Sequence, residues 1–213
     1  MQETFPDDLK IVYKQHPLPN HYWAAIASEG AYAAGAQGKF LEYDELLFSQ
    51  QRQMTTLLRE KAVAMGKSAQ EARSEEVQRE VFIDIAGQMG LDQASFRQDL
   101  ESRAHQSRVQ ADTQEALQVG AGGTPASFVN GRFVSGAKPF EAFKAEVQKE
   151  LDWNKNGNRP DFPKGTNVSQ LRPPRSNRPR VDPDKVYDLT AGGAPFDGPA
   201  GAKVTILHYL DYQ

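Results

Sequence analysis

The chain of 213 residues contains no cysteine. Disulfide bonds, thiolate metal ligands and nucleophilic catalysis by a thiol of this polypeptide are therefore excluded. Long apolar runs are missing as well, so we expect no membrane-spanning helix. The opening segment reads MQETFPDDLK and has neither the basic nor the apolar region of a signal peptide, so we expect none in this chain.

A surplus of charge of one sign is also missing. The 25 Lys and Arg side chains nearly balance the 28 Asp and Glu side chains, whereas nucleic-acid-binding domains usually carry a clear basic excess. We therefore expect no nucleic-acid partner. The histidines show neither HxxxH nor HExxH spacing, so we expect no metal site. We also expect no cofactor. They are His16, His21, His105 and His208.

The residues that are present predict one domain, or one domain with an appendage, because 38% of them are hydrophobic. Residues 9–15 alternate between apolar and polar types, which predicts a strand that ends before Pro17 and Pro19. Apolar residues at helical spacing then recur between 21 and 119, where we expect several amphipathic helices.

A hairpin and a closing helix are predicted next. Two short strands, 126–129 and 132–135, flank the dipeptide Asn130-Gly131, which favours a type I′ turn. Pro139 then fits the first position of a helix that continues to about residue 151.

The remaining residues differ in composition. Residues 152–183 are dense in Pro, Asn, Arg and Gly and predict a linker, which is followed by a segment, 184–213, with one clear strand at 203–210. The spaced arginines of the linker could bind anions or nucleic acid, but such residues more often only keep a linker extended and soluble. They are Arg172, Arg175, Arg178 and Arg180.

In combination, these segments resemble the DsbA-like branch of the thioredoxin-like fold. The second strand, its turn and the first inserted helices of that family are similar to LKIVYKQHPLPNHYWAAIASEG, and its Gly-Thr-Pro loop, hairpin and closing helix are similar to GGTPASFVNGRFVSGAKPFEAF. The resemblance covers roughly residues 1–151. It implies an α/β fold with a thioredoxin-like mixed sheet and a helical domain inserted at about 21–119.

The last segment is similar to the opening of such a domain, because GAPFDGPAGAKVTILHYLDYQ contains a Gly-Pro-rich lead-in and a first strand. The family elements would then stand in rotated order. Two explanations stay open, a piece of a tandem array and a circular permutant, and we favour the array. In either case we expect 203–210 to supply the first strand and to lie parallel to 9–15. The donor is the same chain or a neighbour, and a neighbour would give a strand-exchanged homo-oligomer.

The resemblance also implies a site. The family carries a C-x-x-C motif after its first strand, and this chain lacks it. Thr124-Pro125 matches the cis-proline loop, whose exposed main chain pairs with an extended substrate peptide. His208 occupies the place of a buried carboxylate that relays protons, and we expect either an acid–base role there or a half-buried strand histidine without a role.

We therefore predict a module of a DsbA-like thiol–disulfide oxidoreductase that is redox-inert as this polypeptide. The alternative is a non-catalytic module that binds peptides or assembles by strand exchange. The expected partner is an extended protein or peptide, and the resemblance implies a periplasmic or other extracytoplasmic location.

Overall fold

The computed structural model describes residues 1–165 and 180–212. The chain divides into two compact units. The first, which we call the sheet unit, comprises Met1–His16 and Asp112–Leu210. The second, the helical unit, comprises Pro17–Ala111 and Asp211–Gln213.

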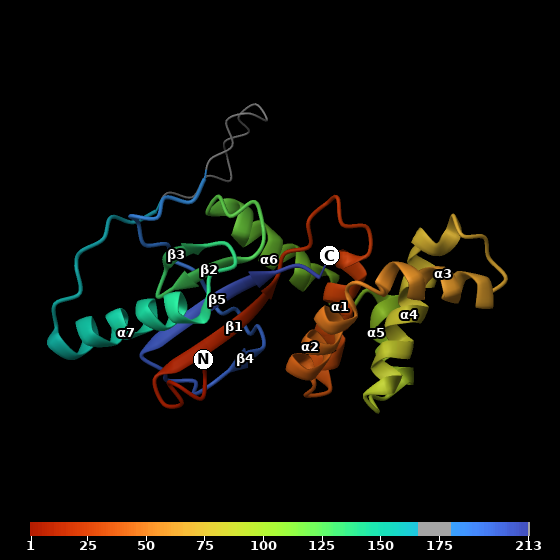
Figure 1. The fold of residues 1–213 in the computed structure, drawn as a ribbon, viewed down its shortest axis with the longest axis horizontal. Helices are drawn as coiled ribbons and strands as arrows, with labels where there is room; N and C mark the ends of the chain where they lie inside the picture. The colour runs from red at the N-terminus through yellow and green to blue at the C-terminus, as the bar shows by residue number, and fades with distance from the viewer. Residues whose placement is uncertain (166–179, 213) are drawn as a thin grey trace. The chain divides into compact units, whose positions relative to one another are not determined.

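The sheet unit is built on a five-stranded mixed sheet in the order β3-β2-β5-β1-β4. The central strand β5 lies parallel to β1 from Leu9↔Val204 to Gln15↔Leu210 and antiparallel to β2 (Figure 1). The alternating patterns thus mark strands, and the segment around 203–210 pairs with the one at 9–15. The strands are β1 (Leu9–Gln15), β2 (Ala126–Val129), β3 (Arg132–Ser135), β4 (Phe196–Asp197) and β5 (Val204–Leu210).

The turn between β2 and β3 has the conformation that its sequence predicts. Asn130 has φ 45° and Gly131 has φ 80°, so both central residues are left-handed, as a type I′ turn requires. A side chain at Gly131 would also come within 2.5 Å of the Tyr187 carbonyl oxygen. Glycine is therefore needed there both for its φ and for the close approach of a second segment.

Both faces of the sheet are packed. On one face, Val147 of α7 (Phe140–Asn156) contacts a cluster that includes Leu9 of β1, and Val204 and Ile206 of β5. On the other face, Ala116 of α6 (Gln106–Gln118) packs in a cluster with Phe128 and Tyr209. The alternation of β5 therefore serves two cores, as its central position requires.

The helical unit contains five complete helices and a short 3-10 turn in its described part. Ser74 and Asp92 cap α4 and α5 by accepting hydrogen bonds from main-chain N–H groups of the first turn. Its core is aromatic, with Trp23 packed against Phe82. The helices are α1 (Ala24–Ala36), α2 (Phe40–Gln50), α3 (Met54–Ala64), α4 (Glu75–Gln88) and α5 (Gln93–Ser102), with the 3-10 turn at Glu71–Arg73.

The predicted linker at 152–183 needs correction at both ends. Helix α7 continues to Asn156, and Trp153 in its last turn packs against Phe162. Near the other end, Val181 is buried in the core cluster with Tyr187.

Helix α7 itself begins at Phe140, with Pro139 just before it. Of the arginines noted above, Arg180 is exposed, and Arg172, Arg175 and Arg178 lie outside the described residues.

On α6, only one of two adjacent apolar residues is buried. Leu117 is 51% exposed, whereas its neighbour Ala116 is fully buried. Adjacent helical residues point about 100° apart, so only one of the two can face the sheet.

Candidate functional site at the two ends of strand β5

The family resemblance assigns a role to three residues near the end of β5. His208 lies on this strand, and Thr124 and Pro125 lie just before the neighbouring strand β2. His208 lies directly opposite Ser127 of β2 and beside Tyr13 of β1 in the strand registers. The Ser127 Oγ and His208 Nδ1 atoms are 2.8 Å apart and form a hydrogen bond. Facing residues of neighbouring strands project to the same side of a sheet, so this pairing follows from the register.

The charge state of His208 follows from its surroundings. Burial lowers the pKa of His208 to about 4, so the imidazole is neutral at neutral pH. The acid–base role predicted from the sequence assumed a pKa near neutrality for His208, and the buried imidazole has a lower one. A neutral imidazole donates through one ring nitrogen and accepts through the other.

The Thr124-Pro125 loop leads directly into β2. Its peptide bond is cis, both residues are half-buried, and Gly122 and Gly123 before them are exposed. Within residues 1–165 and 180–212, the main-chain N–H and C=O of Thr124 make no hydrogen bond. Main-chain groups without a hydrogen-bond partner among the described residues therefore lie just before the start of β2.

The residues that follow β5 belong to the helical unit. There the Tyr212 hydroxyl donates to Asp44 Oδ1 at 2.7 Å, and the Leu18 N–H donates to Asp211 at 3.1 Å. His21 Nδ1 also contacts the Asp211 carboxylate. Burial raises the pKa of Asp44 to about 6, although the hydrogen bond from Tyr212 opposes that rise.

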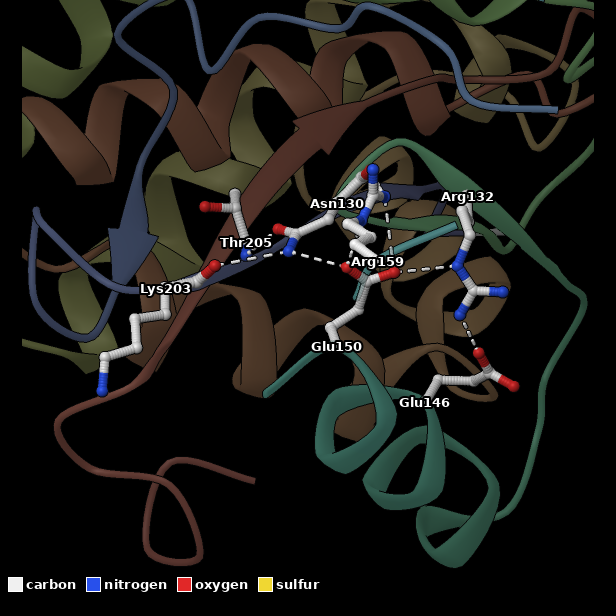
Figure 2. Close-up of polar contacts among 7 residues, drawn as sticks. All are labelled: Asn130, Arg132, Glu146, Glu150, Arg159, Lys203 and Thr205. Atoms are coloured by element: carbon white, nitrogen blue, oxygen red, sulfur yellow. Dashed lines mark hydrogen bonds and ion pairs between the residues drawn. The ribbon is translucent and has the colours of Figure 1, made fainter. Parts of the chain in front are cut away.

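The start of β5 carries a polar cluster that the sequence analysis did not identify, drawn in Figure 2. The Glu150 side chain is fully buried, and its carboxylate accepts from Arg132 Nε at 2.9 Å and from Arg159 Nε at 2.8 Å. Burial alone would raise the pKa of Glu150. Hydrogen bonds from Arg159, Arg132 and Asn130 outweigh it, so the pKa of Glu150 is lowered. The carboxylate is therefore charged at neutral pH.

Asn130 connects this cluster to β5. The side-chain Oδ1 of Asn130 accepts the Thr205 N–H at 2.8 Å, and the main-chain N–H of Asn130 donates to the Thr205 carbonyl oxygen at 2.9 Å. The side-chain Nδ2 donates to the Lys203 carbonyl oxygen at 3.3 Å (Figure 2). The same Nδ2 donates to Glu150 at 3.2 Å. All of these contacts to β5 are made to its main chain, so they fix its register whatever its side chains are.

A cavity of about 310 Å³ adjoins the cluster. It is lined by Asn130, Glu150, Trp153, Asn154, Gly157 and Arg159. The charged groups that face it already satisfy one another, so we assign the start of β5 a structural role. The sequence signal that was missed is the pair Glu146 and Glu150, one helical turn apart on α7.

A second buried charge lies within the sheet unit. Lys14 of β1 is 2% exposed, contacts Glu115, and has its Nζ 3.6 Å from Asp112. The Tyr209 hydroxyl donates to the same Glu115 carboxylate. A buried lysine needs such carboxylate partners, and the sequence pattern of β1 did not reveal them.

No group of three His, Asp or Glu residues suited to a metal ion occurs in the described ranges. No helix in the part of the chain that the structure describes is long and apolar enough to cross a membrane.

Comparisons with known proteins agree with this architecture. The family described as DSBA-like thioredoxin domain matches residues 7–148. The chain is 32% identical over 137 residues to a Na(+)/H(+) antiporter NhaA of Herminiimonas arsenicoxydans, which is 64% of this chain and 18% of the antiporter. It is 30% identical over 141 residues to Na(+)/H(+) antiporter NhaA 1 of Salinispora arenicola, which is 66% of this chain and 18% of that protein. The chain thus spans only about a fifth of these curated relatives. No solved structure matches.

Proposed function

Because the chain belongs to the DSBA-like thioredoxin domain family, we propose that it is a module of a thiol–disulfide oxidoreductase of the DsbA type. The family match over residues 7–148 carries this proposal, and the mixed sheet with its Thr124-Pro125 loop supports it. Without a cysteine, the polypeptide itself supplies no thiolate, so it is redox-inert as given.

Within that function, the role of this chain is to hold an extended protein or peptide at Thr124 and Pro125. Thr124 is half-buried just before the start of β2, and its main-chain N–H and C=O have no partner among the described residues, so an added segment can form main-chain hydrogen bonds there. His208 lies on the neighbouring strand β5, opposite Ser127, and Ser127 follows Pro125 by two residues. The surface thus combines main-chain recognition with one imidazole.

Peptide titration tests this role. The amide resonances of the ¹⁵N-labelled chain are followed by NMR while reduced and carboxymethylated insulin B chain is added. Shifts centred on Thr124 and Ala126, weakened in Pro125→Ala and unchanged in the control Pro139→Ala, are expected. Binding that is equal in Pro125→Ala and the unmodified chain would remove the assignment. An insulin-reduction assay with dithiothreitol tests inertness, and the chain alone should not accelerate it.

The alternative function is assembly by strand exchange. It is supported by β5, which pairs with both neighbours and reaches the sheet by a long connection from α7. Light scattering coupled to size-exclusion chromatography separates the two, because exchange gives a dimer that persists on dilution. A monomer at every concentration would exclude the alternative.

The relatives bear on the setting of the module. In the NhaA antiporters the matching part is a small fraction of a longer protein. Of the two explanations for the rotated order, we favour a domain array over a circular permutant. We also place the module outside the cytoplasm, where disulfide chemistry is stable.

A further inference from the structure

The hydrogen bond between Ser127 and His208 has a direction that the buried groups determine. Ser127 is fully buried, and His208 is the one hydrogen-bond partner of its hydroxyl among the described residues. A serine hydroxyl carries one hydrogen, which is costly to bury without an acceptor. The lone pair of His208 Nδ1 is the acceptor that lies 2.8 Å away.

The opposite arrangement leaves a donor without a partner. If Nδ1 carried the imidazole proton, it would donate to the Ser127 oxygen, and the hydroxyl hydrogen would remain buried without an acceptor. His208 is half-buried, whereas Ser127 is fully buried, and the His208 Nε2 makes no hydrogen bond to another described residue. Both groups are therefore satisfied only when Ser127 donates to Nδ1 and the imidazole proton is on Nε2.

We propose that Ser127 is a positioning residue that holds His208 in its Nε2–H form, so that this end of β5 donates a hydrogen bond to an anion. The class of anion rests on the proposed function: it is the thiolate of a cysteine in an extended peptide held at Thr124. In this arrangement His208 stabilises a negative charge by donation and accepts no proton. The arrangement requires a neutral ring, and burial lowers the pKa of His208 to about 4.

The tautomer is measured directly. Long-range ¹H–¹⁵N correlation spectra of the full chain, labelled with ¹⁵N-histidine, distinguish a protonated Nε2 from a protonated Nδ1. At pH 7 we expect His208 to show a protonated Nε2 and a bare Nδ1. A protonated Nδ1, or a doubly protonated ring, would overturn the proposal without any variant.

Variants then test the role of Ser127. Ser127→Ala should convert His208 to a mixture of tautomers, and Ser127→Thr, which keeps the hydroxyl and suits a strand, should restore one form. Ser135→Ala is the matched control, because Ser135 is exposed on the neighbouring strand β3. An unchanged His208 spectrum in Ser127→Ala would show that the hydroxyl does not set the tautomer.

The ligand class is tested with two extended peptides that differ only in Cys against Ser, at a pH of about 9, where an ordinary thiol is mostly ionised. The Cys peptide should bind about tenfold more tightly, the strength of one hydrogen bond to a charged group, and should shift the His208 Nε2 resonance. Binding of neither peptide would count against the proposed function. Equal binding of both, with His208 unchanged, would overturn the thiolate assignment alone.

Discussion

The two ends of β5 are built on opposite principles. At the start, Asn130 holds the main chain of Lys203 and Thr205, and it is held in turn by a buried carboxylate between two guanidinium groups. At the end, a neutral histidine pairs with one serine, next to a loop in which Thr124 and Pro125 are half-buried. Charge is concentrated where every group already has a partner.

This difference separates stability from binding in one strand. A buried carboxylate with two cationic partners fixes a register, and it has little capacity left for a ligand. A neutral imidazole contributes little to stability and retains a donor for a partner. The following variants are therefore expected to affect stability at the start of β5 far more than at its end.

The largest effect is expected from Glu150→Ala. It leaves the side chain of Arg132, which is only 11% exposed, without its buried partner. The free energy of unfolding should fall by about 3 kcal/mol, at the lower end of values for broken buried pairs because Arg159 is 37% exposed and can reach water. Urea denaturation measures it. Glu146→Ala, at a side chain that is 31% exposed, should cost less than about 1 kcal/mol; equal losses would contradict the comparison.

Asn130→Gly should have the next largest effect. Glycine keeps the left-handed turn but removes the carboxamide that contacts Lys203, Thr205 and Glu150. A loss of about 2 kcal/mol is expected, with faster amide hydrogen exchange at Thr205. The control is Asn158→Gly at an exposed position. Slow exchange at Thr205 in the Asn130 variant would show that the carboxamide does not hold β5.

Beyond the end of β5, Asp44→Asn should stabilise the helical unit at neutral pH. Burial raises the pKa of Asp44 from 3.8 to about 6, so the folded state binds its proton more tightly than the unfolded state. Stability is then lost as pH rises from about 4 to about 6. Asparagine keeps an oxygen for the Tyr212 hydroxyl and avoids that loss.

The gain should be on the order of 1 kcal/mol above pH 6 and absent below pH 4. Thermal unfolding of both proteins at a series of pH values measures it. A gain that is the same at every pH would assign the effect to packing and not to the carboxyl charge.

The smallest effect is the acid dependence of Glu150. Its pKa is lowered in the folded state, so its contribution is present above the unfolded value of 4.5 and is lost as pH falls through the folded pKa. Glu150→Gln should flatten the stability curve of the sheet unit in this range. A curve of unchanged slope would show that the carboxylate is not the group that titrates.

The strands and their turn could be predicted because their signals are local. Alternation marked β1, the segment 203–210 was predicted as one clear strand, and Asn130-Gly131 marked the hairpin. Strand β4 was missed because two residues cannot show a period. The end of α7 was placed too early because Trp153 packs against Phe162, which lies in the Pro-rich segment after the helix and carries no helical signal.

The site was predictable only in part, for the same reason. Thr124, Pro125 and His208 were named from a family resemblance, whereas Ser127 was not, since a serine in a short strand carries no signal by itself. The Glu150 cluster was missed because its partners come from the hairpin, α7 and the segment after it. Charges that meet only in the folded state leave no pattern along the chain.

The parallel pairing of β1 with β5 also has a consequence for how the protein folds. It joins Leu9 to Val204, near opposite ends of the sequence, so the chain entropy of closing a very long loop opposes its formation. The helices of the helical unit depend on contacts much closer in sequence, and such contacts form quickly. The sheet is thus the slow step, and until it closes the apolar residues of β1 have no strand beside them to shield them from other chains.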